Sequence, residues 1–217
     1  MVAESRILSS VQPQVMDQLW AEGWRHFGTE FFRASLMADE GCLKRQVPLR
    51  IRLAGFDPSK SQRRTIRRNR DLEVGIAEAR PEREEAALFE VHKTRFRYNV
   101  PESLEDFLGT RPASEPCRCV QLSVREEGRL VAASFLVLGE RASSSVYAVF
   151  DPALSKRRLG IYTMLAEIEF AQEQGYAFYY RGYATVEGSC YDYKKEFGSV
   201  EFYDWAGHWR GIEEIPP

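Results

Sequence analysis

Basic side chains gather in one short segment, and this is the strongest sign of binding chemistry in the sequence. Residues 58–70 read PSKSQRRTIRRNR, and on a helix five of the cations fall at positions i, i+3, i+4, i+7 and i+8. Like charges four residues apart repel by about 0.2–0.5 kcal/mol per pair, so a helix face of this kind favours an anionic partner. The five cations are Lys60, Arg63, Arg64, Arg67 and Arg68.

Ser59 stands at the start of this predicted helix. A serine there caps the helix, and the free N–H groups and positive dipole end of the first turn attract phosphate or carboxylate. The alternative is a solvated face that the protein's own acids neutralise, with Glu82, Glu84 and Glu85 as examples. Both interpretations remain open from the residues alone.

A second segment has the spacing of an acyl-donor site. Phe150-Asp151-Pro152 leads into residues 156–162, KRRLGIY. Acetyl-CoA-dependent transferases place Gln/Arg-x-x-Gly-x-Gly/Ala here, because small residues let backbone amides approach a pyrophosphate. Arg157 and Gly160 fit that pattern, but Tyr162 stands where glycine or alanine is needed. We therefore expect a cleft for a donor other than CoA, with a helix start that merely packs as the alternative.

Tyrosines and a lysine form the third group. Residues 178–183 read FYYRGY, and Tyr193-Lys194 follows. Hydroxyl and ammonium donors at one place could stabilise a developing oxyanion or contact unpaired bases. Tyrosines packed in the core are the alternative. The three histidines lack the partners of a catalytic triad or a metal site, so neither a triad hydrolase nor a metalloenzyme is predicted.

The composition is that of an ordinary globular protein with an unusual choice of cation. Of 217 residues, 44% are hydrophobic and 29% are charged, and the net charge is −2, which does not indicate a nucleic-acid-binding protein. Only six of the 30 basic residues are lysines. Arginine suits bidentate contacts to phosphate and carboxylate, although the codon bias of a GC-rich genome explains the excess equally well.

Membrane and export signals are missing from the pattern. No apolar run approaches the roughly 18–20 residues that span a bilayer, and residues 1–14 lack the features of a signal peptide. The cysteines are scattered, so we expect free thiols, no metal site and a cytoplasmic protein. They are Cys42, Cys117, Cys119 and Cys190.

Hydrophobic periodicity predicts alternating helices and strands. Helices are expected at 13–24, 60–69, 82–97, 103–108 and 158–174, with a helical turn at 191–197. Extended segments are expected at 24–36, 47–53, 72–77, 117–125, 129–138, 144–150, 177–180 and 200–205, and a polar loop at 38–46.

The order of these elements predicts an α/β (α+β) fold of the GNAT-like acyltransferase type. An antiparallel hairpin is followed by a strand, a turn, a helix and a further strand, and in that fold two strands splay beside the helix N-terminus to hold the acyl donor. We expect a smaller N-terminal α/β region at residues 1–80, which carries the basic helix, and the acyltransferase-like domain at residues 81–217.

Taken together, these segments resemble the arginyl-tRNA–protein transferase family, including its bacterial leucyl-transferring branch. The PSKSQRR block and the pairing of Gly-Tyr with a later Tyr-Lys are the most specific matches. The similar segments are 19–28 (LWAEGWRHFG), 47–51 (VPLRI), 56–64 (FDPSKSQRR), 150–152 (FDP), 159–162 (LGIY), 179–183 (YYRGY) and Tyr193-Lys194.

The cysteines depart from the family pattern. The family carries an N-terminal Cys-x-x-Cys and a second cysteine pair before the Pro-containing strand, whereas only Cys42 lies near the second position here. We therefore expect no cysteine-bound metal or cluster and no cofactor besides the aminoacyl-tRNA donor. The family's Cys-Pro-x-Met reads Gly188-Ser-Cys-Tyr191. This leaves open which amino acid is transferred and which acceptor receives it.

The resemblance implies aminolysis of an aminoacyl-tRNA ester by a protein or peptide N-terminus, of the N-degron type. It implies that Ser59, Lys60, Arg63, Arg64 and Arg67 bind the acceptor end of tRNA. Tyr183, Tyr193 and Lys194 would line the reaction site, and Asp151 would help to shape the donor cleft or orient the amine. Arg157, Gly160 and Tyr162 would line the donor cleft. The alternatives are an acyl-CoA-dependent N-acyltransferase and a non-catalytic tRNA- or protein-binding relative.

Overall fold

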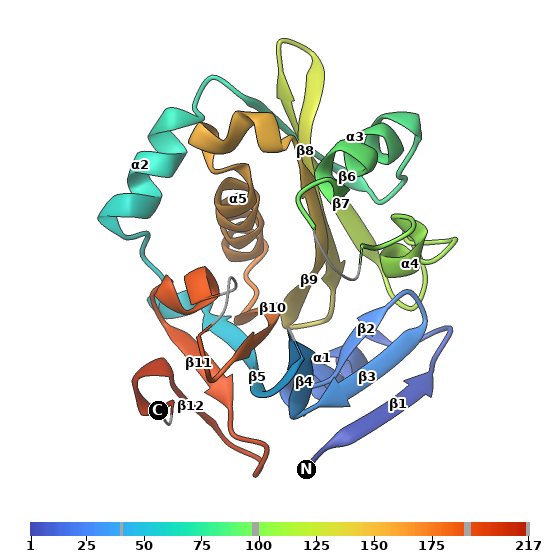
Figure 1. Ribbon diagram of the computed structural model, residues 1–217, viewed down its shortest axis with the longest axis vertical. Helices are drawn as coiled ribbons and strands as arrows, with labels where there is room; N and C mark the ends of the chain where they lie inside the picture. The colour runs from blue at the N-terminus through green and yellow to red at the C-terminus, as the bar shows by residue number, and fades with distance from the viewer. Residues whose placement is uncertain (40, 97–99, 189–191, 216–217) are drawn as a thin grey trace.

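A large mixed sheet organises the chain in the computed structural model, which describes residues 1–39, 41–96, 100–188 and 192–215 (Figure 1). Among these residues the sheet has nine strands in the order β12-β11-β5-β10-β9-β8-β7-β6, with β4 paired to β5, and a separate three-stranded sheet has the order β1-β3-β2. The strands are β1 (Ala3–Ile7), β2 (Arg25–Phe27), β3 (Glu30–Ala34), β4 (Leu36–Asp39), β5 (Cys42–Arg52), β6 (Glu73–Glu78), β7 (Cys119–Glu126), β8 (Arg129–Leu138), β9 (Ala142–Phe150), β10 (Phe178–Thr185), β11 (Val200–Tyr203) and β12 (Trp209–Gly211).

Helices cover both faces of the large sheet. Helix α5 packs on one face through Leu165, Ile168 and Ala171, as the periodicity predicts. On the other face, α1 and α3 bury Trp20 and Phe89 in a second core cluster. The α-helices are α1 (Pro13–Ala21), α2 (Lys60–Arg68), α3 (Arg83–Lys93), α4 (Glu105–Leu108) and α5 (Leu159–Glu173), and the 3-10 turns are η1 (Leu53–Gly55), η2 (Pro152–Arg157), η3 (Asp192–Glu196) and η4 (Ile212–Glu214).

The α/β class and the alternation of helices with strands are confirmed. None of the helices in the described part of the chain is long and apolar enough to cross a membrane. Strands β5 and β6, from the first 80 residues, lie in the same sheet as β7 to β11. The division of the chain into domains at residue 80 stays a prediction.

The polar loop predicted at 38–46 is wrong. Strand β4 ends at Asp39, and β5 already begins at Cys42, with Ala38 paired to Leu43 and Met37 to Lys44. The outer part of β5 is mostly exposed. It therefore lacks the apolar alternation that marks a half-buried strand, and backbone pairing alone holds it.

Other boundaries shift for similar reasons. The five residues of β1 are all exposed, and β12 is only three residues long, so neither gives a hydrophobic signal. The strand predicted at 177–180 continues to Thr185 because β5 pairs with it. The helix predicted to reach Arg97 ends at Lys93, where Thr94 turns its hydroxyl back to the Val91 carbonyl, and Arg97 itself lies outside the described residues.

Candidate functional site

Strands β9 and β10 separate soon after they meet, as the GNAT-like order predicts. They pair in parallel only where residues 178–180 face residues 142–144. Beyond Tyr180, β10 stays with β5 through a bulge that ends at Tyr183. Backbone pairing between β9 and β10 therefore stops at this point, and polar side chains gather there.

We call Arg25, Glu167, Arg181, Gly182 and Lys194 the split-strand cluster. Gly182 has φ +89°, which favours glycine, and a Cβ built on it would lie 3.5 Å from Lys194 Nζ and 3.7 Å from Arg25 Nη2. Two cationic side chains therefore come close to the backbone at the split, and a third projects from the adjacent Arg181. A concentration of positive charge of this kind attracts an anion.

Arg25 reaches the cluster from β2. Its guanidinium donates hydrogen bonds to the Ser144 hydroxyl and the Ser145 carbonyl, both on β9 at the split. The side chain is buried, and this burial lowers its pKa. Arg25 thereby ties the small N-terminal sheet to the open edge of β9.

Arg181 is a buried cation whose guanidinium has no hydrogen-bond acceptor among the described residues. It is 4% exposed, and among the described residues none accepts a hydrogen bond from its three guanidinium nitrogens. The guanidinium lies over the Phe197 ring, 4.5 Å from the ring centroid, and burial lowers its pKa to about 9. An unpaired buried charge is costly, so this side chain is set to receive an anionic group.

Glu167 supplies the negative charge of the cluster from the buried face of α5. The Tyr179 hydroxyl donates to its Oε2, and the Ser145 hydroxyl donates to its Oε1 at 3.3 Å. Burial raises the pKa of Glu167 to about 7, against the opposing effects of these hydrogen bonds and of the Arg25 charge. The carboxyl therefore changes its charge near neutral pH.

The structure brings together part of the predicted catalytic set. Lys194 Nζ donates to the backbone oxygen of Tyr183 at 3.3 Å, and Tyr193 precedes it on η3, half-buried against the core under α5. The Tyr183 side chain points elsewhere, because its hydroxyl donates to the Gly23 carbonyl at 2.7 Å, and burial raises its pKa. This hydroxyl fixes the N-terminal sheet against β10.

Asp151 lies apart from these residues. It follows the far end of β9, six residues and about 20 Å of strand beyond Ser145. Its Oδ1 accepts the backbone N–H of Ala153, and its Oδ2 pairs with Arg129 at 3.0 Å. A role for Asp151 in shaping the donor cleft stays a prediction.

The residues of the predicted donor cleft have partners within the protein. Arg157 pairs with Asp71 at 2.8 Å and with Glu126 at 2.6 Å. A Cβ on Gly160 would lie 2.9 Å from the Phe150 ring, so packing alone favours glycine there. Tyr162 is half-buried against the same core cluster as Phe150. Binding of the donor by these residues stays a prediction.

Helix α2 exposes its cations as predicted. The Ser59 hydroxyl accepts the Gln62 N–H at 3.3 Å, and the Gln62 side chain accepts the Ser59 N–H at 2.8 Å, a reciprocal cap at the start of the helix. The cations lie in solvent, and three have neither an ion pair nor a hydrogen bond within the described ranges. These three are Lys60, Arg64 and Arg67.

The other cations of α2 have local partners. Arg63 pairs with Asp57 at 3.0 Å, and Arg68 donates to the Lys156 carbonyl. The acids proposed to neutralise the helix do not do so: Glu84 pairs with Arg125, and Glu85 accepts a hydrogen bond from Gln121. Neutralisation by Glu84 and Glu85 is therefore wrong, and most of the helix charge remains open to an outside anion.

The described cysteines divide into one exposed thiol and two core thiols. Cys42 is exposed on β5, while Cys117 and Cys119 are buried in the core, and burial raises the pKa of both core thiols. The described ranges contain no group of three or more potential metal ligands. Cys190 lies outside the described residues, as does the rest of the Gly188–Tyr191 departure except Gly188.

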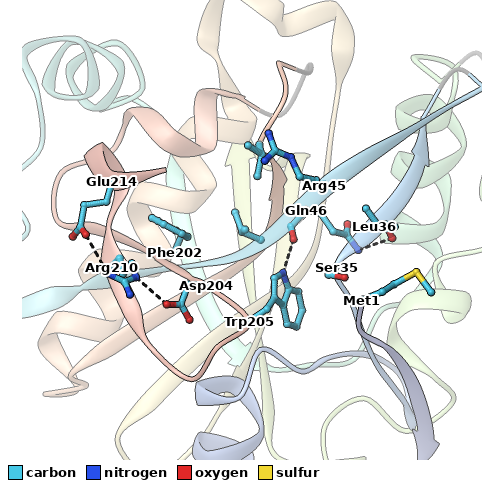
Figure 2. Close-up of a pocket in the computed structure, with 12 residues that line it drawn as sticks. Met1, Ser35, Leu36, Arg45, Gln46, Phe202, Asp204, Trp205, Arg210 and Glu214 are labelled. Carbon is cyan, nitrogen blue, oxygen red and sulfur yellow. Dashed lines mark hydrogen bonds and ion pairs between the residues drawn. The ribbon is translucent and has the colours of Figure 1, made fainter. Parts of the chain in front are cut away.

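A pocket of about 640 Å³ opens where β10 ends (Figure 2). The α2 helix follows the opposite end of β5, in another part of the molecule (Figure 1). The wall of the pocket is formed by apolar side chains from β4, β5, β11 and the segments that follow β10 and β11. Charged side chains stand at the edge in Figure 2, with Arg210 between Asp204 and Glu214. The apolar residues that line it include Leu36, Val47, Val186, Phe202 and Trp205.

Comparison with known families accounts for the arrangement. The model of the arginine-tRNA-protein transferase N terminus matches residues 2–64, and that of its C terminus matches residues 84–204. The chain belongs to the arginine-tRNA-protein transferase family. The expected resemblance is confirmed, and α2 and the split-strand cluster are parts of a member of this transferase family.

Curated relatives of this transferase-family chain share a name. An aspartate/glutamate leucyltransferase of Xanthomonas axonopodis pv. citri is 32% identical over 177 residues, covering 76% of this chain and 69% of the relative. Another, from Marinobacter nauticus, is 29% identical over 206 residues, covering 92% and 83%. The relatives are therefore matched over most of their own length.

Solved structures with a similar fold are more distant. L-PGS from Bacillus licheniformis has a TM-score of 0.49 and 18% identity, covering 76% of this chain, which spans 57% of that protein's length. FemX has a TM-score of 0.49 and 10% identity, with 87% and 65% covered.

Sequence reasoning missed three charged residues of the site in this transferase-family chain. Arg181 lies inside the YYRGY segment, and Arg25 lies inside LWAEGWRHFG. Both segments resemble the family, but neither arginine was predicted to have a function. Glu167 gave a further signal, since it is a carboxylate on the apolar face of a helix. Charged residues at positions that the pattern assigns to the core would have identified all three.

Proposed function

We propose that this chain transfers an amino acid from an aminoacyl-tRNA to the N-terminal amine of an acceptor protein. The observation that carries the proposal is the match to both halves of the arginine-tRNA-protein transferase family. The curated relatives define the first substrates to test, a leucyl donor and acceptors that begin with aspartate or glutamate. Aminoacyl-tRNA is the only donor required, and the cytoplasm supplies it.

The reaction is aminolysis of an ester. The acceptor amine attacks the ester carbonyl and a C–N bond forms; the C–O bond to the tRNA then breaks, and the terminal hydroxyl of the tRNA leaves with a proton. An α-amino group has a pKa of about 7.7–8.0, so a useful fraction is neutral near pH 7. Alignment of the two substrates and stabilisation of the oxyanion can therefore supply most of the catalysis.

The split-strand cluster suits the oxyanion. Lys194 and Arg25 approach the Gly182 backbone, and Arg181 is a buried cation that lacks an anion among the described residues. In a site shielded from water, such charges act more strongly on a developing negative charge than they would in solvent. We assign Lys194 and Arg181 to the reacting carbonyl, with Tyr193 beside them and Arg25 holding the edge of β9.

The exposed cations of α2 suit the acceptor stem of tRNA. Lys60, Arg64 and Arg67 have no partner among the described residues, and Arg63 has only an exposed ion pair. Contacts between such side chains and phosphates position a nucleic acid without reading its sequence. The α2 helix packs beside the start of α5, so the proposed donor-cleft residues Arg157, Gly160 and Tyr162 lie on the path from the stem to the split.

Transfer assays test the proposal. The protein is incubated with tRNA charged with one radiolabelled amino acid at a time, leucine first, and with peptides that carry each N-terminal residue. We expect label in the peptide fraction, and a loss of about 100-fold or more in kcat for Lys194→Ala. Lys195→Ala is the matched control, because Lys195 pairs with Asp192 at 2.9 Å instead, and we expect less than a threefold change.

Three outcomes would overturn the proposal. Transfer from none of the charged tRNAs would exclude the aminoacyl-tRNA reaction. Tight binding of CoA in calorimetry, with no binding of tRNA, would establish the acyl-CoA alternative in its place. Binding of tRNA without transfer would instead indicate the non-catalytic alternative.

A further inference from the structure

The pocket beyond the split-strand cluster has the size and lining of a binding site. Its volume is about 640 Å³, within the range of small-molecule sites, and Figure 2 shows side chains from separate strands converging on it. Leu36, Val47, Val186 and Phe202 supply an apolar wall. Nothing in the proposed reaction so far uses this space.

Trp205 lines this pocket and lies near Tyr183, the residue that follows Gly182 on β10. Its backbone has φ +61°, a left-handed conformation that is costly for a bulky residue. The carboxylate of Asp204 enforces that turn, since its Oδ1 accepts the N–H groups of Ala206 at 2.8 Å and His208 at 3.0 Å. The Trp205 indole N–H donates to Gln46 (Figure 2), and its ring lies 6.1 Å from the Tyr183 ring.

The charges at the edge of the pocket neutralise one another. Arg210 pairs with Asp204 at 2.8 Å and with Glu214 at 3.4 Å, and Arg45 pairs with Glu187 at 2.7 Å. The pocket therefore presents an apolar interior with no net attraction for phosphate. The exposed cations of α2 lie in another part of the molecule (Figure 1). The cationic helix therefore suits tRNA, and the apolar pocket suits a different substrate.

Strand β10 runs from the split-strand cluster to the pocket, so its length sets the distance between them. Gly182 is four residues from Val186, about 13 Å at 3.3 Å per residue, and Val47 in the pocket wall pairs with Ala184 halfway along. An extended peptide has nearly the same rise per residue. With its terminal amine at the level of Gly182, its third residue lies at the level of Ala184 and its fifth at the level of Val186.

We propose that this pocket binds an apolar side chain from the third to the fifth residue of the acceptor polypeptide. The inference rests on the proposed function, because that function places the acceptor amine at the cluster. The enzyme then selects acceptors by an internal apolar residue as well as by their first residue.

Hexapeptides test the position of that residue. Each begins with aspartate, contains one leucine at position 2, 3, 4, 5 or 6 among serines, and carries a fluorophore at its C-terminus. We expect the KM of transfer to be at least tenfold lower, and binding by fluorescence anisotropy without tRNA correspondingly tighter, when leucine is at positions 3 to 5. Equal values for all five peptides would overturn the inference.

A variant that fills the pocket with a larger side chain tests whether the peptide binds there. Val186→Trp is expected to raise the KM for the best peptide at least tenfold, while kcat and the KM for aminoacyl-tRNA change less than twofold. Val74→Trp is the matched control, because Val74 is an exposed strand residue on β6 away from the pocket. A rise in the KM for aminoacyl-tRNA, or no change in the peptide KM, would exclude the acceptor as occupant.

Failure of this inference differs from failure of the proposed function. If no charged tRNA supports transfer, anisotropy still decides: peptide binding that depends on leucine position and is lost in Val186→Trp retains the pocket assignment. If transfer proceeds but neither leucine position nor Val186→Trp matters, the function stands and the pocket assignment falls.

Discussion

At the scale of single residues, Arg181 combines a cost to stability with a gain in binding. Its guanidinium is buried over Phe197 with no acceptor among the described residues, whereas Arg25, buried nearby, donates to Ser144 and Ser145. A folded protein retains an unpaired charge of this kind when the charge serves a ligand. The two arginines therefore have different roles, one in binding and one in positioning.

Replacement of Arg181 by leucine should separate these effects. Arg181→Leu removes an unpaired buried charge, so we expect the free energy of unfolding to rise by about 1–3 kcal/mol. Transfer should fall at least 100-fold in kcat/KM, because the cation that faces the developing oxyanion is gone. Thermal unfolding and the transfer assay measure the two effects, and a variant that is both less stable and fully active would contradict the assignment.

Glu167 makes the stability of the fold depend on pH. Burial raises its pKa from 4.5 to about 7, so the folded protein holds this proton more tightly than the unfolded chain. Its contribution to stability is complete below about pH 4.5 and is lost as the pH rises through 7, a change of about 3 kcal/mol. Between pH 5 and 8 the free energy of unfolding should therefore fall more for the unmutated protein than for Glu167→Gln, whose side chain stays neutral. Urea unfolding of both proteins at the two pH values checks this, and equal losses would refute it.

At the scale of elements, α2 is a helix with an unusual attachment. Its buried face consists of Gln62, Thr65 and the capping Asn69, while Ile66 is exposed. Hydrogen bonds fasten it to the start of α5, from the Asn69 amide to the Arg157 carbonyl and from Arg158 to Ser61. Apolar packing contributes little, so the exposed surface of the helix is free to carry charge.

Charge reversal on α2 should weaken the donor alone. Arg64→Glu with Arg67→Glu is expected to raise the KM for aminoacyl-tRNA about 10- to 100-fold and to reduce the salt dependence of tRNA binding by about 1.4–1.8 in log–log slope. The KM for the peptide should not change. Arg80→Glu with Arg83→Glu makes the same charge change near α3, and an equal effect there would show that only net charge matters.

At the scale of the whole molecule, the cationic helix α2, the split-strand cluster and the pocket follow one another across the fold. The α2 helix is at the upper left of Figure 1, the split between β9 and β10 is central, and the strands around the pocket are below. Arg25 and the Tyr183 hydroxyl join the N-terminal sheet to the central split. Donor and acceptor can therefore approach the split from different sides.

This separation predicts that both substrates bind before either product leaves. Initial rates measured while both aminoacyl-tRNA and peptide concentrations vary should give intersecting double-reciprocal lines. Parallel lines would instead indicate that the amino acid is first transferred to the protein itself, and would contradict the proposed direct aminolysis.

The sequence predicted these surfaces unevenly, for physical reasons. The cap at Ser59 and the exposed cations of α2 are local properties that spacing reveals. The apolar face of α5, with Leu165, Ile168 and Ala171, is a local property as well. The order of the strands predicts the sheet against which this face packs. The outer half of β5 and the exposed strand β1 depend on backbone pairing with distant residues, which no side-chain pattern records.

The site itself shows the same limit. Lys194 belongs to the Tyr-Lys motif, but it meets Arg25 beside Gly182, and these two cations are more than 160 positions apart in the sequence. The pocket is beyond sequence reasoning for the same reason, because Leu36, Val47 and Phe202 meet only through the sheet. Arg181 and Glu167 are the exceptions, since charge within an apolar pattern marks them.

The polar attachment of α2 also makes this helix a preferred site for limited proteolysis. Six basic residues lie within positions 60–70, so trypsin meets a cleavage site at nearly every turn once the backbone opens. Hydrogen bonds to the start of α5, rather than a buried apolar face, keep that backbone closed. Cleavage in limited digestion should therefore begin here, and bound tRNA should delay it, so that a gel lane reports where the nucleic acid lies.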